Sequence, residues 1–389
     1  MDLDYLTNNW NYPTAVSVGV GSIAQLADHC MARGIRAPLL VTDPGLAELE
    51  MTGAVVQQLK NSGLEVAIYS GIKSNPTGEN VDAGADAFRK GSHDGVIAFG
   101  GGSALDAGKS IALIAEHHRP VFEFADEADT IALVDETRVA PIIAVPTTAG
   151  TGSEVGRAAV IMDTQQQRKR IIFHPRLLPV QVILDPELTV GLPPHITAAT
   201  GMDALSHNLE ALSADSFHPM AMGIAVEGIR LVREFLPRAF ADGTDLEART
   251  QMLVASSMGA TAFQRGLGAM HALSHPLGAI YDAHHGLLNA IVMPYVLKEN
   301  ESAIAPTLVR AARYLDLPNK TFDGFLDWVL GLRAELGIPH SLAEIGIDAV
   351  QAIRVGEMAV ADPTAGGNPI ALTARQYTKM FERAVEGAL

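Results

Sequence analysis

The sequence predicts a two-part fold, with an N-terminal α/β domain built on a parallel sheet and a C-terminal all-α domain. Two observations carry this prediction. Short, continuous apolar segments alternate with helical patterns up to about residue 190, and beyond it apolar residues recur only at helical spacing. The 389 residues suit two or three domains at roughly 150 residues each. We place the boundary after residue 190, which gives domains of residues 1–190 and 191–389.

The first half contains five apolar segments that we expect to be buried strands of one sheet. Each is short and is separated from the next by a helical pattern or a turn signal such as Asp43-Pro44-Gly45. Continuous apolar strands are typical of a parallel sheet covered on both faces. The expected strands are Leu39–Thr42, Val66–Tyr69, Val96–Phe99, Ile142–Val145 and Val182–Leu184.

The pattern changes at Leu192-Pro193-Pro194. Further on, apolar side chains repeat every three or four residues, which indicates amphipathic helices and no strands. We expect helices around residues 222–232, 252–258 and 325–330. Since ligands favour clefts between domains, the seam near residue 190 is where we expect a binding site.

Composition and charge exclude several classes of protein. Hydrophobic residues make up 48% and charged residues 19%, so the chain is too apolar for disorder. A net charge of −16 disfavours nucleic acid and anionic membranes as partners, because both would repel it. The start, MDLDYLTNNW, lacks the pattern of a signal peptide, and no apolar stretch reaches the roughly 20 residues of a membrane span. Cys30 is the single cysteine, so we expect a cytoplasmic protein.

The stretch GGGSALDAGKS, residues 100–110, follows the apolar segment Val96–Phe99 and opens a helical pattern. It does not fit the P-loop, because Ser103 stands where the first glycine is required. It does not fit the Rossmann fingerprint either, because Leu105 replaces the last glycine. Consecutive glycines before a helix still let backbone N–H groups approach an anion. A phosphate-binding loop and a plain strand-to-helix turn both remain open for this stretch.

A second loop favours a dinucleotide. Residues 146–154, PTTAGTGSE, place hydroxyls and glycines directly after the expected strand Ile142–Val145. Two such loops at strand ends of one sheet suit a dinucleotide better than a single phosphate. Asp43 ends another strand, where a carboxylate can accept hydrogen bonds from a ribose and repel a 2′-phosphate, which favours NAD over NADP. A turn-initiating role for Asp43 is the alternative.

The second half contains a group of histidines at helical spacing. Asp203 and His207 are four residues apart, as are His271 and His275, and His284-His285-Gly286 follows shortly after. Residues at i and i+4 share a helix face, and these pairs have apolar neighbours. A divalent cation would satisfy such groups together, and a buried hydrogen-bond network is the alternative. A four-coordinate site needs fewer ligands than this, so one histidine is expected to orient a ligand or act in catalysis.

The remaining ionisable side chains give weaker signals. Glu210 and Asp215 lie near the first pair, but nothing in the sequence forces them inward. Eight histidines show no comparable spacing, and we expect surface or structural roles for His29, His93, His117, His118, His174, His195, His218 and His340.

Together these motifs resemble the iron-containing (group III, metal-dependent) alcohol dehydrogenase family, over nearly the whole chain. The resemblance rests on four stretches: Gly100–Ser103 with Asp106 and Lys109, Pro146–Glu154, Gly201–His207, and Gly268–Gly286 with its HALSHPLGAIYDAHHG core. It implies a dehydroquinate synthase-like architecture, with NAD and a metal between a Rossmann-like domain and an all-helical domain. It also implies a homodimer or larger homo-oligomer acting on a small-molecule alcohol or aldehyde.

The resemblance also assigns roles by position. The metal ligands are Asp203, His207, His271 and His285, and His275 corresponds to a histidine near nicotinamide and substrate that is not a ligand. Fe²⁺ is the family expectation, while three imidazoles and a carboxylate also accept Zn²⁺. The implied cofactor-binding residues are Asp43, Asn75, Gly101, Gly102, Ser103, Asp106, Thr147, Thr148, Thr151 and Lys169.

The expected reaction is reversible hydride transfer between a small primary alcohol, or diol, and NAD⁺, with His275 as proton shuttle. One alternative in the same fold is a reductase specialised for a semialdehyde or hydroxy acid, with Arg157 or Arg265 on the substrate carboxylate. Another is a metal-dependent hydrolase or lyase without nicotinamide, for which Asp43, Gly102 and Thr147 would have no use.

Overall fold

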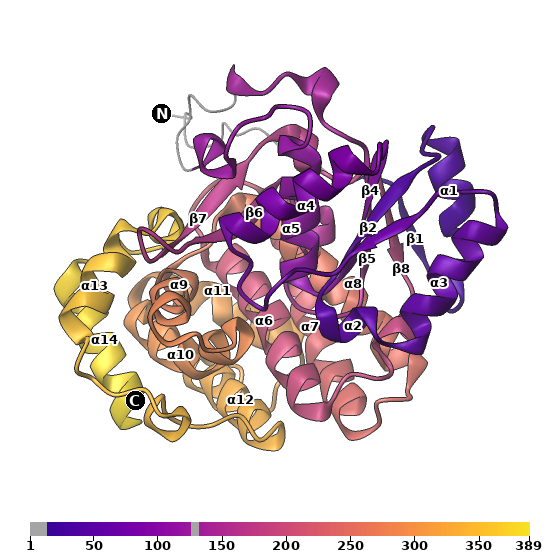
Figure 1. The fold of residues 1–389 in the computed structure, drawn as a ribbon. Coiled ribbons are helices and arrows are strands. Elements are labelled where there is room, and N and C mark those ends of the chain that lie inside the picture. Colours follow the sequence, from indigo (N-terminus) through magenta and orange to yellow (C-terminus); the bar gives the residue numbers. More distant parts are fainter. Residues whose placement is uncertain (1–13, 126–131) are drawn as a thin grey trace, which may run out of the picture. The chain divides into compact units, whose positions relative to one another are not determined.

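The structure, a computed structural model, describes residues 14–125 and 132–389 (Figure 1). These residues divide into two compact units. One contains residues 14–148 and 152–191, and the other contains residues 192–389 together with Ala149–Thr151. The loop after residue 148 therefore contributes three residues, including Thr151, to the mainly C-terminal unit.

The first unit is built on a six-stranded sheet in the order β1-β8-β5-β4-β2-β3. Every strand pair in it is parallel, which confirms the predicted α/β class. All five predicted strands are present, with each end within one residue of its predicted position, and a sixth strand, β1, pairs with β8 at one edge. The strands are β1 (Val16–Val18), β2 (Pro38–Val41), β3 (Ala67–Tyr69), β4 (Gly95–Gly100), β5 (Ile142–Pro146) and β8 (Gln181–Leu184).

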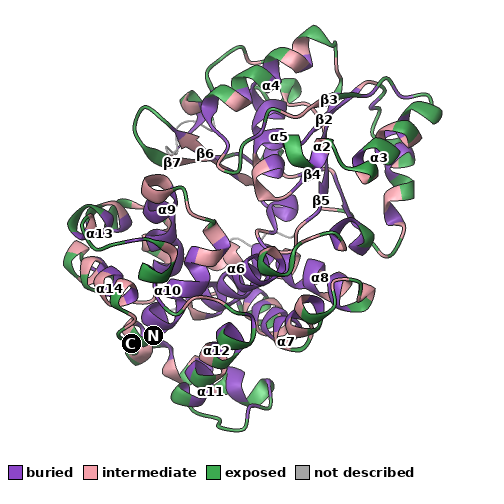
Figure 2. Ribbon diagram, turned by 60° about the horizontal axis from the view of Figure 1, so that its bottom comes forward, coloured by how far each residue is buried: buried purple, intermediate pink, exposed green. Residues whose placement is uncertain are grey.

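Burial follows the position of each strand in the sheet. The four inner strands are buried along their whole length, whereas the edge strands β1 and β3 are partly exposed (Figure 2). Leu40, Phe99 and Val145 pack with Leu26 and Leu59 from two helices in one core. This is why the strand sequences are apolar without alternation. The helices of this unit are α1 (Leu26–Ala32), α2 (Pro44–Ala47), α3 (Glu50–Asn61), α4 (Gly78–Lys90) and α5 (Gly102–Ile114).

This unit also contains an antiparallel hairpin that was not predicted from the sequence. Strand β6 (Ala158–Asp163) pairs with β7 (Arg168–Phe173) as a separate two-stranded sheet. In β6 every second residue is buried, as expected for a half-exposed strand. The segment Ala158–Met162 is continuously apolar, so this alternation is hidden in the sequence.

The second unit is helical, and its described residues contain no strand, which confirms the all-α prediction. Helix α6 is deeply buried, with all residues from Thr197 to Leu212 in the buried class, and it packs against α7, α8 and α10 (Figure 2). The helices are α6 (Pro194–Ser213), α7 (Pro219–Ala241), α8 (Leu246–Ala262), α9 (Ala269–Tyr281), α10 (His285–Glu299), α11 (Glu301–Tyr314), α12 (Phe322–Glu335), α13 (Ala352–Ala361) and α14 (Ala374–Glu386).

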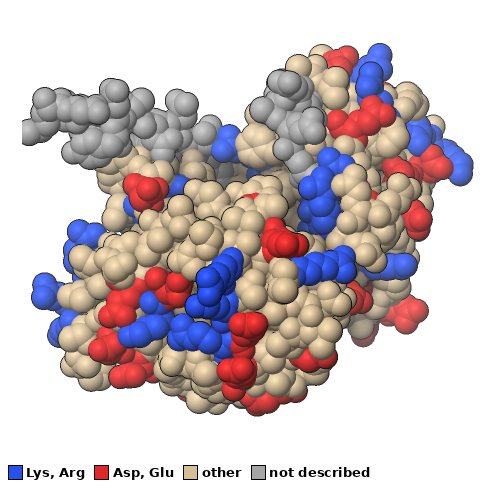
Figure 3. Space-filling view, turned by 90° about the vertical axis from the view of Figure 1, so that its left-hand side faces the viewer, with Lys and Arg blue, Asp and Glu red and all other residues tan. Residues whose placement is uncertain are grey.

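Two surface properties bear on partners. Among the described residues, no helix combines the length and apolar character needed to cross a bilayer. Figure 3 shows Lys and Arg side chains interspersed with Asp and Glu on one face of the molecule, so the acidic excess is not gathered there into a single field.

Candidate active site

Helix α6 carries three ionisable side chains on its inner face. Asp203, His207 and Glu210 are separated by four and three residues, which places them on one side of the helix. All three are buried, among apolar neighbours such as Leu205 and Leu209. Buried ionisable groups need partners, and the adjacent helices provide them.

Helices α9 and α10 bring further imidazoles to this face. His271 and His275 lie one turn apart on α9, and His285 is the first residue of α10. A Cβ on Gly286 would lie 2.4 Å from the carbonyl oxygen of Ala199 in α6, so only glycine lets α10 begin this close to α6. The close approach places His285 Nε2 3.7 Å from Asp203 Oδ1.

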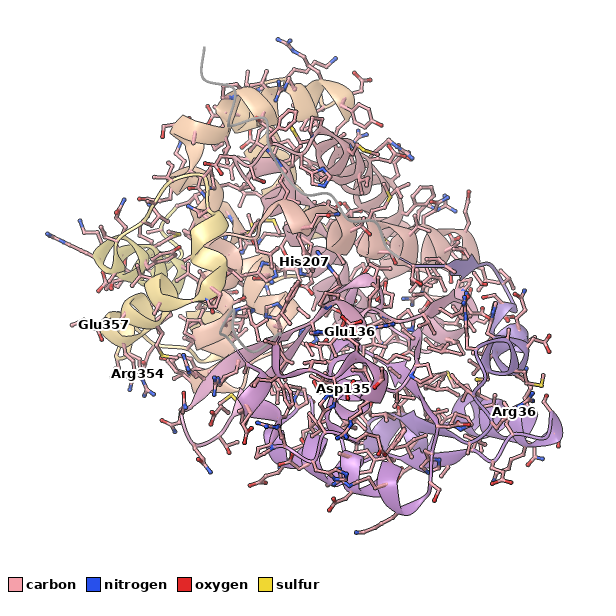
Figure 4. The ribbon with its side chains drawn as sticks, turned by 90° about the horizontal axis from the view of Figure 1, so that it is seen from above. Arg36, Asp135, Glu136, His207, Arg354 and Glu357 are labelled. Atoms are coloured by element: carbon pink, nitrogen blue, oxygen red, sulfur yellow. The ribbon has the colours of Figure 1, made fainter. Side chains whose placement is uncertain are left out.

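The shortest contact in the group joins two imidazoles. His207 Nε2 and His271 Nε2 are 3.0 Å apart, and one potential ligand atom each from Asp203, His207 and His271 all lie within 4.8 Å of one another. Figure 4 shows His207 inside the helical unit, away from its outer surface. His285 joins this group through its contact with Asp203, so the four predicted ligands are brought together.

The hydrogen-bond partners of the two Nδ1 atoms determine how the rings of His207 and His271 are protonated. His207 Nδ1 lies 3.2 Å from the carbonyl oxygen of Gly150, and His271 Nδ1 lies 2.6 Å from Glu210 Oε2. Because these oxygens only accept, both Nδ1 atoms donate, and the two Nε2 atoms of the neutral rings turn lone pairs toward each other. A cation between the nitrogens would satisfy both lone pairs at once. With the carboxylate of Asp203 beside them, the residues fit a divalent metal.

The surroundings shift the pKa values of the two rings in opposite directions. Burial lowers the pKa of His207 to about 4, against the opposing effect of Asp203, so the ring is neutral at pH 7 and able to coordinate. Burial also lowers the pKa of His271, but the carboxylate of Glu210 more than offsets it and the net pKa is raised. A carboxylate behind a ligating histidine fixes its tautomer and increases its basicity.

Asn289 completes the group from one turn further along α10. Its Nδ2 lies 2.8 Å from Asp203 Oδ1, and 3.2 and 3.3 Å from the Nε2 atoms of His285 and His271. The side chain is fully buried. Its amide donates to Asp203 and holds that carboxylate toward the imidazoles.

His275 lies beside the ligand group and has a different partner. Its ring centre is 5.5 Å from that of His285 and 5.8 Å from that of His271. His275 Nδ1 is 2.9 Å from Asp362 Oδ2. Burial raises the pKa of Asp362, but the His275 ring and hydrogen bonds from Thr364 outweigh it, so the pKa is lowered and the carboxyl stays ionised at neutral pH.

Three side chains of this site were missed from the sequence. Glu210, which the sequence left without a direction, points inward, whereas Asp215 is exposed. The signal for Glu210 was its spacing of seven residues from Asp203, which is two helical turns. Asn289 gave a similar signal, four residues after His285. Asp362 gave none, because 87 residues separate it from His275.

In the α/β unit, parallel pairing brings the predicted cofactor loops to one edge. Val41 pairs with Ala98, and Gly100 with Pro146, so strands β2, β4 and β5 end side by side. The backbone N–H of Thr147 donates to the carbonyl of Gly100 over 3.0 Å. The residues that follow these strand ends are Asp43, Gly101, Gly102, Ser103, Thr147 and Thr148.

The backbone at this edge fits a diphosphate. Gly100 has φ +143°, a conformation that side chains rarely adopt. A Cβ on Gly101 would lie 3.4 Å from the side chain of Thr148, an ordinary van der Waals contact, so only a side chain larger than a methyl group would crowd the loop. No side chain caps the N-terminus of α5, which leaves its first N–H groups to an anion. Asp43 Oδ1 accepts a hydrogen bond from Leu46 N at 2.9 Å, so the carboxylate also caps α2.

The other predicted cofactor residues lie apart from these strand ends. Ser103 Oγ donates to the carbonyl of Ser74, which brings the segment with Asn75 close to the glycine loop. The carboxylate of Asp106 binds Ser153 Oγ and Val160 N and lies 3.2 Å from Lys109 Nζ, so it anchors the hairpin β6–β7 within the fold. Lys169 lies on β7 of that hairpin. Cofactor contacts by Asn75, Asp106, Thr151 and Lys169 stay predictions.

The arginines considered for a substrate carboxylate differ in availability. Arg265 donates to the carbonyls of Ala211, Leu212 and Ser216, so it closes the C-terminal end of α6. Arg157 lies over the ring of Phe173 at 5.3 Å and is partly exposed.

A parallel sheet with a glycine-lined helix N-terminus, and a buried Asp/His group in a helical unit, fit an enzyme that binds a nucleotide and a metal. Family models for iron-containing alcohol dehydrogenase and for the C-terminal part of the Fe-containing alcohol dehydrogenase family match residues 13–186 and 197–385. The chain belongs to the iron-containing alcohol dehydrogenase family. It is therefore an alcohol dehydrogenase that uses NAD and a metal, which rules out a hydrolase or lyase without nicotinamide.

Individual relatives are similar over nearly their whole length. The chain is 40% identical to 4-hydroxybutyrate dehydrogenase of Cupriavidus necator, covering 96% of this chain and 99% of the relative. A crystal structure of 1,3-propanediol oxidoreductase matches with a TM-score of 0.90 and 33% identity, over 97% of this chain and 100% of that one. Sulfoacetaldehyde reductase from Bifidobacterium kashiwanohense, in complex with NAD⁺, matches with a TM-score of 0.87 and 28% identity, over 97% and 98%.

Proposed function

We propose that the chain interconverts a small primary alcohol, or diol, with its aldehyde. Asp203, His207, His271 and His285 hold the metal in this proposal, and the loops after β2, β4 and β5 hold NAD. The observation that carries it is the 3.0 Å contact between the Nε2 atoms of His207 and His271, beside the Asp203 carboxylate. When bound, the metal supplies a Lewis acid for the substrate oxygen and NAD exchanges a hydride with the carbinol carbon.

The protein's own contribution is to hold these ligands in position. Glu210 and the carbonyl of Gly150 fix the tautomers of His271 and His207, and Asn289 orients Asp203. Iron is the expected metal from the family, and the donor set also suits zinc.

His275 is the proposed proton shuttle. With Nδ1–H donated to Asp362, its Nε2 is the atom left to take up the proton of the substrate hydroxyl and return it in the reverse direction. General acid–base catalysis contributes about 10²- to 10⁴-fold, so His275→Asn is expected to lower kcat within that range while the metal stays bound. Unchanged kcat in a metal-loaded His275→Asn protein would remove this role.

The cofactor part of the proposal uses the predicted residues Asp43, Asn75, Gly101, Gly102, Ser103, Asp106, Thr147, Thr148, Thr151 and Lys169. Asp43 favours NAD, because its charge opposes a 2′-phosphate. Residues 1–190 would thus form the NAD-binding domain and residues 191–389 the metal-binding catalytic domain.

A second candidate substrate is a hydroxy acid with its semialdehyde. The 40% identity to a 4-hydroxybutyrate dehydrogenase favours it. A substrate carboxylate needs a cationic partner, and Arg157 is the better placed of the two arginines, because three backbone carbonyls already occupy Arg265.

A matched substrate panel distinguishes the candidates. NADH formation would be followed with butan-1-ol, 1,3-propanediol and 4-hydroxybutyrate, which place an apolar, hydroxyl or carboxylate group away from the reacting carbon. The main proposal predicts the higher kcat/KM with the first two substrates. A higher kcat/KM with 4-hydroxybutyrate that falls selectively in Arg157→Gln supports the second candidate. No metal-dependent turnover with any substrate contradicts both.

We also propose a cytoplasmic homodimer or larger homo-oligomer. The family resemblance supports the assembly. The single cysteine, Cys30, supports the compartment, because it is buried and burial raises its thiol pKa to about 12, which suits a structural, unreactive thiol.

A further inference from the structure

Asp362 uses its two carboxylate oxygens for different purposes. It lies between α13 and the short 3-10 helix Pro363–Gly367, where Oδ1 accepts hydrogen bonds from both the backbone N–H (2.9 Å) and the hydroxyl (2.5 Å) of Thr364. Oδ2 lies 2.9 Å from His275 Nδ1. The turn therefore fixes one oxygen and directs the other at the imidazole.

The segment that carries Asp362 is fastened to α9 at two points. Asn368, at the end of the 3-10 helix, accepts from Ala269 N over 3.1 Å at the first residue of α9, and also accepts from Asn300. Asp362 binds His275 in the second turn of the same helix. Two attachments to one helix restrict how the carboxylate can move relative to the imidazole.

The surroundings leave little of this pair accessible to solvent. The side chains of His275 and Asp362 are only 9% and 10% exposed. A carboxylate accepts only, so His275 must donate from Nδ1, and the free position of the neutral ring is Nε2. Histidine–carboxylate pairs of this kind hold the imidazole in one tautomer and one orientation.

We propose that Asp362 is a positioning residue, which fixes the ring and the Nδ1–H tautomer of His275 so that Nε2 is the atom that exchanges the proton. The proposal rests on the proposed proton shuttle for its kinetic consequence. Its structural consequence, the tautomer of His275, does not depend on that role.

The substitution Asp362→Asn gives a sharp test because Thr364 determines how the new amide is oriented. The N–H and O–H of Thr364 both require an acceptor, so the amide oxygen must occupy the Oδ1 position. The NH₂ group then faces His275 Nδ1, which must become an acceptor and move the ring proton to Nε2. The variant thus inverts the tautomer with almost no change in shape.

The first readout is the tautomer itself. Zinc-loaded protein labelled with ¹⁵N-histidine would be compared by NMR, and the signals of His275 identified by their loss in His275→Asn. The expected result is protonation at Nδ1 in the unsubstituted chain and at Nε2 in Asp362→Asn. The same tautomer in both proteins would overturn the proposal, whatever happens to turnover.

The second readout is kinetic. Asp362→Asn is expected to lower kcat by about 10²- to 10⁴-fold, with metal content and the KM for NAD unchanged. Asp362→Glu, which restores an acceptor, should recover part of this loss. The control is Glu357→Gln, the same chemical change on the exposed side of α13, where Figure 4 shows Glu357 and Arg354 extending outward.

The outcomes separate the two proposals. Suppose that the tautomer of His275 is inverted in Asp362→Asn, and that kcat is normal both in this variant and in His275→Asn. This result upholds the positioning by Asp362 and rejects the proton shuttle. Asp362→Asn could lose its metal or fail to fold, and Thr364→Val, which removes one hydrogen bond to Asp362, then provides the second test. If Thr364→Val leaves both the tautomer of His275 and kcat unchanged, Asp362 is only a structural residue and the proposal is overturned.

Discussion

The two candidate sites of this chain are built from different materials. At the sheet edge, backbone groups and missing side chains make the cofactor loop, as at Gly100, Gly101 and the uncapped start of α5. In the helical unit, the site consists of side chains that three helices direct to one place. Deletion of a single side chain should therefore destroy the metal site, whereas the cofactor site should be weakened only by substitutions that fill the loop.

The largest expected effect comes from deleting a metal ligand. His207→Ala leaves His271 Nε2 without its facing nitrogen and should lose both metal and turnover. Loss of several kcal/mol of Lewis-acid stabilisation corresponds to at least about a 10³-fold fall in kcat/KM. Metal per chain, measured by mass spectrometry alongside NADH formation, checks this. Retention of metal and activity would reject the ligand assignment.

A smaller effect is expected from a change at Glu210, the carboxylate that binds His271. The backbone N–H of Met270 donates to Glu210 Oε1 over 2.7 Å, and in Glu210→Gln the amide oxygen must keep this position. The amide NH₂ group then faces His271 Nδ1, which moves the ring proton of His271 to Nε2. Metal affinity should fall about 10- to 100-fold. Competition with a chelator measures it, and Asp215→Asn, an exposed carboxylate just beyond α6, is the control. Equal metal affinity in the two variants would contradict the role of Glu210.

The sheet edge should respond to added bulk. Gly101→Val places side-chain atoms against Thr148 and in the path of the phosphates, and should weaken NAD binding about tenfold, equivalent to about 1.4 kcal/mol. Metal content should stay unchanged. Calorimetric titration with NAD⁺ provides the measurement, and unaltered affinity would show that the diphosphate lies elsewhere.

The smallest effect concerns the choice between NAD and NADP. Asp43→Ser removes the charge while a hydroxyl can still cap α2. The ratio of kcat/KM for NADP⁺ to that for NAD⁺ should rise about two- to fivefold, since exposed charge interactions are worth up to about 1 kcal/mol. A ratio that stays constant would leave Asp43 with its capping role alone.

The sequence predicted the regular parts of the molecule well because their periods are visible along the chain. Apolar runs such as Val96–Phe99 gave the inner strands, and spacings of four gave Asp203 with His207 and His271 with His275. The hairpin β6–β7 was missed because Ala158–Met162 is apolar on both faces, which conceals the alternation.

The supporting contacts were less predictable. Nothing in a helical pattern shows that Asp362 reaches His275, since that contact depends on how α13 and the following turn pack against α9. Likewise Asp106 is used inside the fold, by Ser153 and Val160, and a motif alone does not show this. The choice of His285 came from the family resemblance, and the close approach allowed by Gly286 gives its physical basis.

In the proposed function, the Asp/His group of the helical unit holds a metal on which turnover depends. The most direct measurement strips the protein of metal and titrates it anaerobically with Fe²⁺ or Zn²⁺ while NADH formation from 1,3-propanediol is followed. Activity is expected to rise with added metal and to saturate at a single ion per chain, with no such rise in His207→Ala. Full activity in the stripped protein, or the same titration curve in His207→Ala, would contradict it.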